Sequence, residues 1–337
     1  MIAARCRVGV YAMAAPRVFL SRELPPAAMA ALRAGCDLTV NPHDRPLTTP
    51  ELIEAATGMD GLLCLLTDTI DTGVLDIQPR LKVVSNYAVG YNNVDVAAAT
   101  ARGIPVTNTP GVLTETTADF TFALLMAVAR RVAEGDRFVR AGRFTAWEPM
   151  LLLGTDVHGK TLGIVGAGRI GLSVARRARG FGMRVLYSGP NAASPEAVAE
   201  LALERVELPD LLRLSDYVSL HAPYSQRTHH LIGAEQLRGM RPTAYLINTA
   251  RGAMVDEAAL VRALRERWIA GAGLDVFEDE PRLASGLQEL DNVVLAPHIA
   301  SASLETRTRM GLLAVENLLA VLRGGRARHT VNPEVYG

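Results

Sequence analysis

The chain has 337 residues, and its 35 basic and 35 acidic side chains give a formal net charge of zero. This balance argues against partners such as nucleic acid or an anionic membrane surface, and the length predicts two domains. The longest apolar run, Phe120–Ala129, is about half of the roughly 20 residues that a membrane-spanning helix needs. Lys82 and Lys160 are the only lysines, which argues against Schiff-base chemistry.

The N-terminal residues 1–15 have a basic start and an apolar stretch too short for a signal peptide, so we expect a disordered extension. Cys6, Cys36 and Cys64 are odd in number and lack the spacing of metal ligands. We therefore expect unpaired thiols that pack inside a cytoplasmic protein, and the sequence predicts no metal site.

From residue 16 onward, short apolar runs alternate with amphipathic stretches, which predicts a mainly parallel sheet with helices between its strands. A long helix over 114–134 is predicted because Phe120, Leu124, Val128 and Val132 recur every four residues. The other elements of this first series are strands at 17–20, 61–65, 81–84 and 104–106, and helices at 26–33, 50–56 and 94–102.

A second α/β series follows, and a last helix begins near Leu304 and ends at Gly324. The sequence therefore predicts an α/β protein with two Rossmann-like, doubly wound parallel sheets. The strands of the second series are predicted at 161–165, 184–187, 217–220, 244–247, 272–274 and 293–295.

A G-x-G-x-x-G pattern, Gly166-Ala-Gly168-Arg169-Ile170-Gly171, stands between the first strand of this series and a helix. Gly166 permits a tight turn, Gly168 lets a pyrophosphate approach the backbone, and Gly171 allows close contact between helix and strand. The helix N-terminus adds amide donors for the phosphates. Binding of a dinucleotide is the favoured interpretation, and a structural turn is the alternative.

The end of the next strand, where an acidic residue would hold the ribose hydroxyls of NAD, reads Ser188-Gly189-Pro190-Asn191. Without an acid, the loop does not repel a 2′-phosphate, and Ser188 and Asn191 could donate to one. The loop contains no arginine to bind that phosphate. The sequence therefore favours NADP(H) over NAD(H) and leaves the use of both open.

Three polar residues follow three strands of the second series: Arg251, Glu280 and His298. Ligands of open α/β sheets bind at the carboxyl ends of the strands, so these side chains could meet beside a nicotinamide ring. Each also has a structural interpretation, since Arg251 could cap a carbonyl, Glu280 could be solvated, and His298 could be an ordinary residue at a strand end.

Long motifs of the chain resemble the D-isomer-specific 2-hydroxyacid dehydrogenases, with glyoxylate/hydroxypyruvate reductases as the closest group. The resemblance spans residues 16–333. It implies a flavodoxin-like substrate domain that consists of residues 16–109 and 300–337. A nucleotide-binding domain, residues 110–299, would be inserted between these two segments. The motifs are NYAVGYNNVD at 86–95, GIPVTNTPG at 103–111, TLGIVGAGRIG at 161–171, INTARG at 247–252, GLDVFEDEP at 273–281 and APHIAS at 296–301.

The resemblance implies that Arg251, Glu280 and His298 are the catalytic set, and their chemistry fits this role. A guanidinium binds the substrate carboxylate, and the imidazole donates a proton to the carbonyl oxygen. The Glu280 carboxylate would favour the protonated imidazole, so reduction should fall as the pH rises. His221 lacks an acidic partner and is the weaker catalytic candidate.

Further contacts are implied by the same resemblance. In the first domain, the amides of Val89 and Gly90 could clamp the substrate carboxylate, although an ordinary turn is the alternative. Trp147, in an aromatic loop, could reach the substrate site of the partner subunit in a homodimer, or could pack in the core. Other expected cofactor contacts are Thr117 (alternatively a helix cap), Ser188, Gly189, Pro190, His221, Pro223, Thr228, Thr249, Ala250 and Asp275.

The expected function is NAD(P)H-dependent reduction of a small 2-keto acid, glyoxylate or hydroxypyruvate, to the D-2-hydroxy acid. Other D-2-hydroxyacid, phosphoglycerate, D-lactate-type or phosphite dehydrogenases are enzymatic alternatives. A dinucleotide-sensing protein similar to the corepressors of this scaffold, or a member that binds cofactor without chemistry, is a non-enzymatic alternative. His158, His229, His230 and His329 show no partner pattern and are expected at the surface.

Overall fold

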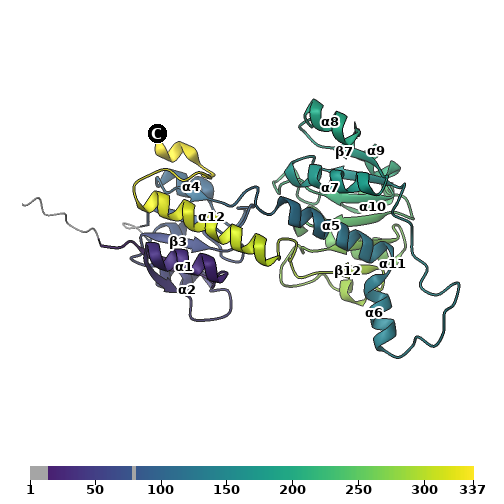
Figure 1. Ribbon diagram of the computed structural model, residues 1–337, viewed down its shortest axis with the longest axis horizontal. Coiled ribbons are helices and arrows are strands. Elements are labelled where there is room, and N and C mark those ends of the chain that lie inside the picture. The colour runs from purple at the N-terminus through teal and green to yellow at the C-terminus, as the bar shows by residue number, and fades with distance from the viewer. Residues whose placement is uncertain (1–13, 78–80) are drawn as a thin grey trace, which may run out of the picture. The chain divides into compact units, whose positions relative to one another are not determined.

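The computed structural model describes residues 14–77 and 81–337, which form two compact units (Figure 1). The first unit contains the described residues up to Pro110 together with Arg307–Gly337, and the second is Gly111–Thr306. The second boundary thus lies later than the predicted 299/300. Of the predicted N-terminal extension, residues 1–13 lie outside the described residues, and residues 14 and 15 are exposed.

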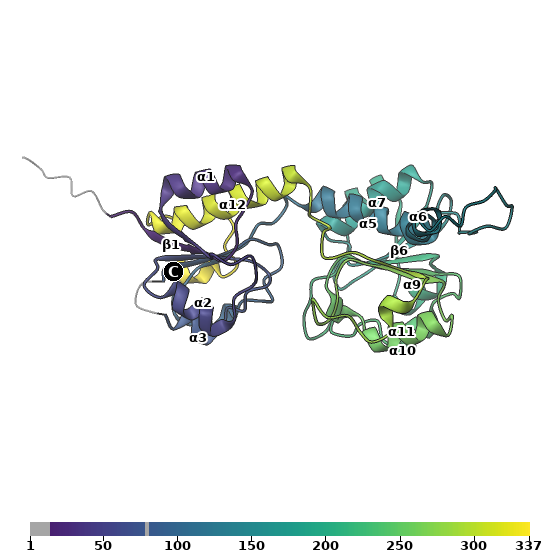
Figure 2. The same cartoon turned by 90° about the horizontal axis from the view of Figure 1, so that it is seen from below.

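The first unit has a five-stranded parallel sheet in the order β2-β1-β3-β4-β5, which is the flavodoxin-like order. Helices α1 and α12 lie on one face of the sheet, and α2 and α3 lie on the other (Figure 2). The elements are β1 (Arg17–Leu20), α1 (Pro26–Gly35), β2 (Asp37–Val40), α2 (Thr49–Ala56), β3 (Gly61–Cys64), α3 (Thr72–Leu75), β4 (Val83–Asn86), α4 (Val96–Ala101), β5 (Val106–Thr107) and α12 (Leu304–Leu322).

The second unit has seven parallel strands in the order β12-β11-β10-β9-β6-β7-β8. Counted from β6, this is the doubly wound order 3-2-1-4-5-6 with one strand added, so the predicted fold class is confirmed. The topological switch point lies between β6 and β9. The strands are β6 (Thr161–Val165), β7 (Arg184–Ser188), β8 (Leu203–Arg205), β9 (Tyr217–Leu220), β10 (Tyr245–Asn248), β11 (Gly271–Leu274) and β12 (Val293–Leu295).

The helices of the second unit cover both faces of its sheet. Helices α5 and α7 lie on one face, and α9, α10 and α11 lie on the other (Figure 2). Each face of the sheet has one cluster of buried apolar side chains that packs against its helices. Strands buried on both faces explain the continuous apolar runs in the sequence. The helices are α5 (Thr114–Ala129), α6 (Val132–Arg140), α7 (Arg169–Gly180), α8 (Pro195–Leu201), α9 (Leu208–Leu214), α10 (Ala234–Gly239) and α11 (Glu257–Arg265).

The structure differs from the sequence prediction in several elements. The edge strands β2 and β8 were missed, because β2 alternates exposed with half-buried residues and β8 has only three residues. The short helix α3 was missed as well. The predicted helix 114–134 is confirmed as far as Ala129 and is wrong beyond it, since Arg131 has a positive φ of 54° and separates α5 from α6. Among the described residues, no helix has the length and apolar character needed to cross a membrane.

Two of the three cysteines fall in the described part of the chain. Cys36 and Cys64 are free and buried, as predicted for packing residues, whereas Cys6 lies outside the described residues. Burial raises the pKa of the Cys36 thiol to about 11, so this thiol is protonated at neutral pH.

Candidate active site

The glycine loop connects β6 to α7 at the topological switch point. A side chain at Gly166, which has a φ of +99°, would place its Cβ 2.6 Å from the amide nitrogen of Ala222. A Cβ at Gly171 would meet the carbonyl oxygen of Gly166. These two glycines are therefore required by close backbone contacts.

Gly168 differs from the other two glycines, because a Cβ there would have no described atom within 4 Å. It is the N-cap residue of the twelve-residue helix α7, whose first turn contains Arg169 and Ile170 and has no acidic side chain. Open space in front of a helix N-terminus suits an anionic phosphate. The loop thus fits the pyrophosphate of a dinucleotide.

The end of β7 carries the residues that would face the adenosine ribose. Ser188 is buried, Gly189 is half-buried and Pro190 is exposed. The guanidinium of Arg205, at the end of the neighbouring strand β8, donates to the carbonyl oxygen of Gly189 at 3.1 Å and lies 3.5 Å from that of Pro190. The loop itself lacks an arginine, but the fold brings one to it from another strand.

Threonine hydroxyls link α5 to the loop after β10. The Thr121 hydroxyl lies 2.9 Å from that of Thr249 and 2.8 Å from the carbonyl oxygen of Thr117. Thr117 is buried in α5, whose N-cap residue is Leu113, so the alternative of Thr117 as a cap is wrong. Both predicted contacts, Thr117 and Thr249, therefore lie in one hydrogen-bonded chain.

The loop after β9 contains three predicted cofactor contacts. Burial lowers the pKa of His221 to about 3, and its Nε2 lies 2.8 Å from the Ser219 hydroxyl. A neutral His221 is a poor proton donor near pH 7. The Thr228 hydroxyl donates within its own turn to the carbonyl oxygen of the exposed Pro223 and accepts from the Ser225 amide. The structure thus uses Thr228 to hold this loop.

His298 and Glu280 form a pair at the carboxyl edge of the sheet. His298 Nδ1 lies 2.9 Å from Glu280 Oε2, and the amide of Phe277 donates to Glu280 Oε1 at 3.1 Å. Burial by itself raises the pKa of the Glu280 carboxyl group. The hydrogen bond to His298 and the charge of His298 lower this pKa, and together with smaller contributions they outweigh burial, so the net shift is downward. Glu280 is therefore ionised at neutral pH.

The turn after β12 is held by Asp275, which follows β11. The buried carboxylate of Asp275 accepts from the amides of Ile299 and Ala300 at 2.7 and 2.8 Å, and its carbonyl oxygen accepts from the His298 amide. His298 has a φ of 56°, in the left-handed region that costs energy for a residue with a side chain. The Asp275 carboxylate, predicted as a cofactor contact, therefore supports the His298 conformation.

Arg251 follows β10 and is half-buried. Burial lowers the pKa of its guanidinium, and the charge of Glu280 acts in the opposite direction. Asn248, which sequence reasoning missed, accepts from the Ala250 amide and donates to the carbonyl oxygen of Arg251. Arg251 and His298 thus share Glu280 as a neighbour, and the three predicted catalytic side chains lie in one region of the second unit.

The loop of Arg251 touches the loop of Glu280. A Cβ at Gly252 would lie 1.8 Å from the carbonyl carbon of Phe277, so only glycine fits between the two loops. The carboxylate of Glu257, another residue that sequence reasoning missed, accepts from the amides of Glu278 and Ala284. The available sequence signal was weak, since Glu257 is an acid in the first turn of a helix, directly after the capping Asp256.

In the first unit, Val89 and Gly90 form a half-buried loop after β4. Asn108 donates to the carbonyl oxygen of Val89 at 2.8 Å, and Asn86 donates to that of Gly90 at 2.9 Å. The two asparagine side chains fix the orientation of the peptide groups in this loop. Neither asparagine was singled out in the sequence.

Trp147 is 80% exposed and lies in the loop after α6, where residues 141–150 are all exposed. Packing in the core of its own unit, the alternative considered for Trp147, is therefore wrong. Several large apolar side chains that are exposed in one segment are uncommon on the surface of a monomeric protein. The same segment exposes Phe144 and Met150, and Leu153, three residues after it, is exposed as well.

Comparison with known proteins places these features in a family. Residues 122–300 match the family model described as D-isomer specific 2-hydroxyacid dehydrogenase, NAD binding domain. A glyoxylate reductase of Korarchaeum cryptofilum is 55% identical over 322 residues, which are 95% of this chain and 97% of the relative. A glyoxylate reductase of Thermococcus kodakarensis is 50% identical over 324 residues, with 95% and 97% of the two chains covered.

Solved structures agree with this result. A crystal structure of a protein from Thermus thermophilus has a TM-score of 0.87 at 48% identity and covers 94% of this chain and 99% of its own. The NADPH-dependent glyoxylate/hydroxypyruvate reductase of Sinorhizobium meliloti, solved with NADP and malonate, has a TM-score of 0.83 at 34% identity. That comparison covers 95% of this chain and 98% of the other.

Proposed function

The chain belongs to the D-isomer-specific 2-hydroxyacid dehydrogenases, and we propose that it reduces a small 2-keto acid to the D-2-hydroxy acid with a nicotinamide dinucleotide. When bound, the reduced cofactor supplies the hydride, which goes to the carbonyl carbon. The carbonyl oxygen takes a proton from His298. The observation that carries this proposal is the contact between His298 and Glu280 at the sheet edge that also holds the glycine loop.

The roles of the three side chains follow from their contacts. Glu280 engages Nδ1 of His298, which leaves Nε2 as the nitrogen that can donate the proton. The ionised Glu280 accepts a charge-assisted hydrogen bond at Nδ1 and so holds the imidazole ring in one orientation. Nη1 of Arg251 donates to the carbonyl oxygen of Ala250 at 2.7 Å, and further N–H groups of the guanidinium are proposed to bind the substrate carboxylate and orient the carbonyl group.

We propose glyoxylate or hydroxypyruvate as the substrate, because the curated relatives are named glyoxylate reductases and a solved relative is a glyoxylate/hydroxypyruvate reductase. In the first unit, the loop of Val89 and Gly90 is proposed to bind the substrate carboxylate through its amides. The hydrogen bond from Asn108 to the carbonyl oxygen of Val89 supports the proposal, because it fixes the peptide group that carries the Gly90 amide.

For the cofactor, we propose a preference for NADP(H) over NAD(H). No acid follows β7, and Arg205 lies against the carbonyl oxygens of Gly189 and Pro190. An exposed guanidinium at this place suits a 2′-phosphate, which takes charge-assisted hydrogen bonds. The solved Sinorhizobium meliloti relative is itself NADPH-dependent.

We propose that the protein is a homodimer in which the exposed loop of Trp147 contacts the partner subunit. The gathering of exposed apolar side chains in this loop supports the proposal. A Trp147→Ala variant should shift the dimer toward the monomer in sedimentation velocity, and an unchanged dimer would contradict the proposed contact.

The proposal is tested by a spectrophotometric screen in which oxidation of NADPH and of NADH is followed with glyoxylate, hydroxypyruvate, pyruvate and 3-phosphohydroxypyruvate. We expect turnover with the first two acids and a lower KM for NADPH than for NADH. If no keto acid oxidises either cofactor while both cofactors bind, hydride transfer is refuted and the dinucleotide-sensing alternative is favoured.

A further inference from the structure

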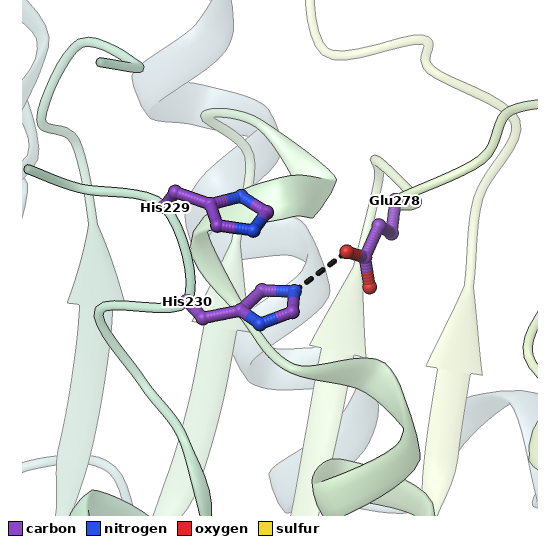
Figure 3. Close-up of side chains that lie close together, drawn as sticks. All are labelled: His229, His230 and Glu278. Carbon is purple, nitrogen blue, oxygen red and sulfur yellow. Dashed lines mark hydrogen bonds and ion pairs between the residues drawn. The ribbon is translucent and has the colours of Figure 1, made fainter. Parts of the chain in front are cut away.

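His229, His230 and Glu278 form a cluster at the carboxyl edge of the second unit, close to the loop of Glu280 but outside the proposed catalytic set (Figure 3). Both histidines lie in the loop after β9, and Glu278 lies in the loop after β11. One possible ligand atom from each side chain lies within 4.8 Å of the other two. The sequence pattern predicted only surface histidines here.

The imidazole rings of the cluster are already oriented toward one another. The rings of His229 and His230 stack with their centroids 4.0 Å apart and an interplanar angle of 19°. His230 Nε2 lies 2.6 Å from Glu278 Oε1. Figure 3 shows that both imidazole rings extend from their loop toward the Glu278 carboxylate. The three polar groups therefore lie close together, and the stacked rings must rotate before the in-plane lone pairs of both can point at one ion.

Neighbouring groups hold the cluster in place. The Tyr224 hydroxyl lies 3.3 Å from Nδ1 of His229, an arrangement that leaves Nε2 of that ring for a ligand. The amide of Glu278 donates to the buried carboxylate of Glu257 at 2.8 Å, which fixes the backbone from which the Glu278 side chain extends. A hydrogen-bonded second layer of this kind orients the groups that bind a metal ion.

We propose that His229, His230 and Glu278 bind a divalent transition-metal ion, such as Zn²⁺ or Ni²⁺. Two imidazoles and one carboxylate suit these ions, whereas Mg²⁺ and Ca²⁺ prefer sites made of oxygen atoms. Three protein ligands leave further coordination positions for water. The proposal does not depend on hydride transfer, because none of the three residues belongs to the proposed catalytic set.

The distances in the cluster allow an ion to bind after the side chains rotate, because one ligand atom from each lies within 4.8 Å of the other two. Metal bonds of about 2.0–2.2 Å to nitrogen and oxygen require ligand atoms roughly 3.0–3.4 Å apart at ordinary coordination angles. The contact of 2.6 Å between His230 and Glu278 would therefore open by less than about 1 Å when an ion replaces the shared proton. All three side chains are exposed or half-buried, so rotation is open to them.

The proposal is tested by titrating the purified full-length protein with NiCl₂ in an isothermal calorimeter, after removal of any affinity tag and treatment with a chelator. We expect one Ni²⁺ per chain. The variants His229→Gln and Glu278→Gln should each raise Kd by at least about tenfold. The matched control His158→Gln changes an exposed histidine of the same unit and should leave Kd unchanged.

A second readout uses Co²⁺, whose visible absorption reports coordination by imidazole nitrogen. The wild type should show ligand-field bands that saturate at one equivalent, and His229→Gln should lose them while its circular dichroism and Tm without metal stay those of the wild type. Equal Ni²⁺ affinities of the wild type, His229→Gln and Glu278→Gln would overturn the proposal. A Co²⁺ spectrum of the free aqueous ion with the wild-type protein would also overturn it.

Discussion

Replacing Glu280 by glutamine tests whether the charge of this residue, rather than its position, sustains the proton donor. Glu280→Gln keeps a side chain of the same size that can still accept a hydrogen bond from Nδ1 of His298. It removes the negative charge that strengthens this hydrogen bond. Because the hydrogen bond holds the His298 ring with Nε2 free to donate a proton, kcat/KM for reduction should fall in the variant.

The size of this loss follows from the geometry of the pair. At 2.9 Å the contact is a charge-assisted hydrogen bond, which is roughly 1–1.5 kcal/mol stronger than a hydrogen bond between neutral groups. The side chains of His298 and Glu280 are 31% and 37% exposed, so solvent screening keeps the difference near the lower value. Since about 1.36 kcal/mol corresponds to a factor of ten in rate, we expect kcat/KM to fall roughly five- to tenfold.

The assay measures kcat/KM for glyoxylate reduction at neutral pH, where the lowered pKa of Glu280 keeps this carboxyl group ionised. Asp279→Asn is the matched control, since it removes one negative charge from the same exposed run without the contact to His298. An unchanged kcat/KM in Glu280→Gln would refute the reasoning, as would an equal loss in Asp279→Asn.

Three further variants test other parts of the site. Arg205→Ala should raise the KM for NADPH about tenfold and leave the KM for NADH unchanged, because a charge-assisted hydrogen bond to the 2′-phosphate is lost. Steady-state kinetics with both cofactors measures this difference. Glu257→Ala should lower stability by about 1–3 kcal/mol in urea unfolding and lower kcat, because two loop amides lose their buried acceptor. Gly252→Ala should destabilise the protein by about 3 kcal/mol or more in the same unfolding assay, since the new Cβ would collide with the backbone of Phe277.

Each of these variants has its own control. Arg213→Ala removes another exposed arginine of the same unit and should leave both cofactor KM values unchanged. Glu257→Gln retains one amide acceptor and should lie between the wild type and Glu257→Ala in kcat. Gly180→Ala places a methyl group in open space at the end of α7, and a stability loss similar to that of Gly252→Ala would show that the predicted collision is not the cause.

Much of the fold could be predicted because its signals are local. Buried parallel strands appear as apolar runs, and the glycine loop carries its spacing within six residues, from Gly166 to Gly171. The helix break at Arg131 and the edge strands β2 and β8 could not be predicted in this way. Their conformations depend on neighbours distant in the chain, and their sequences lack a strong apolar period.

The sequence by itself determined the class of fold, the dinucleotide loop and the identity of Arg251, Glu280 and His298 as candidates, because each lies in a motif at a strand end. Only the tertiary structure decided which groups surround them. The approach of Arg205 to the loop after β7, and of Glu278 to two histidines after β9, joins positions 16 and 48 residues apart. Such contacts arise from strand order and loop packing, which no local spacing records.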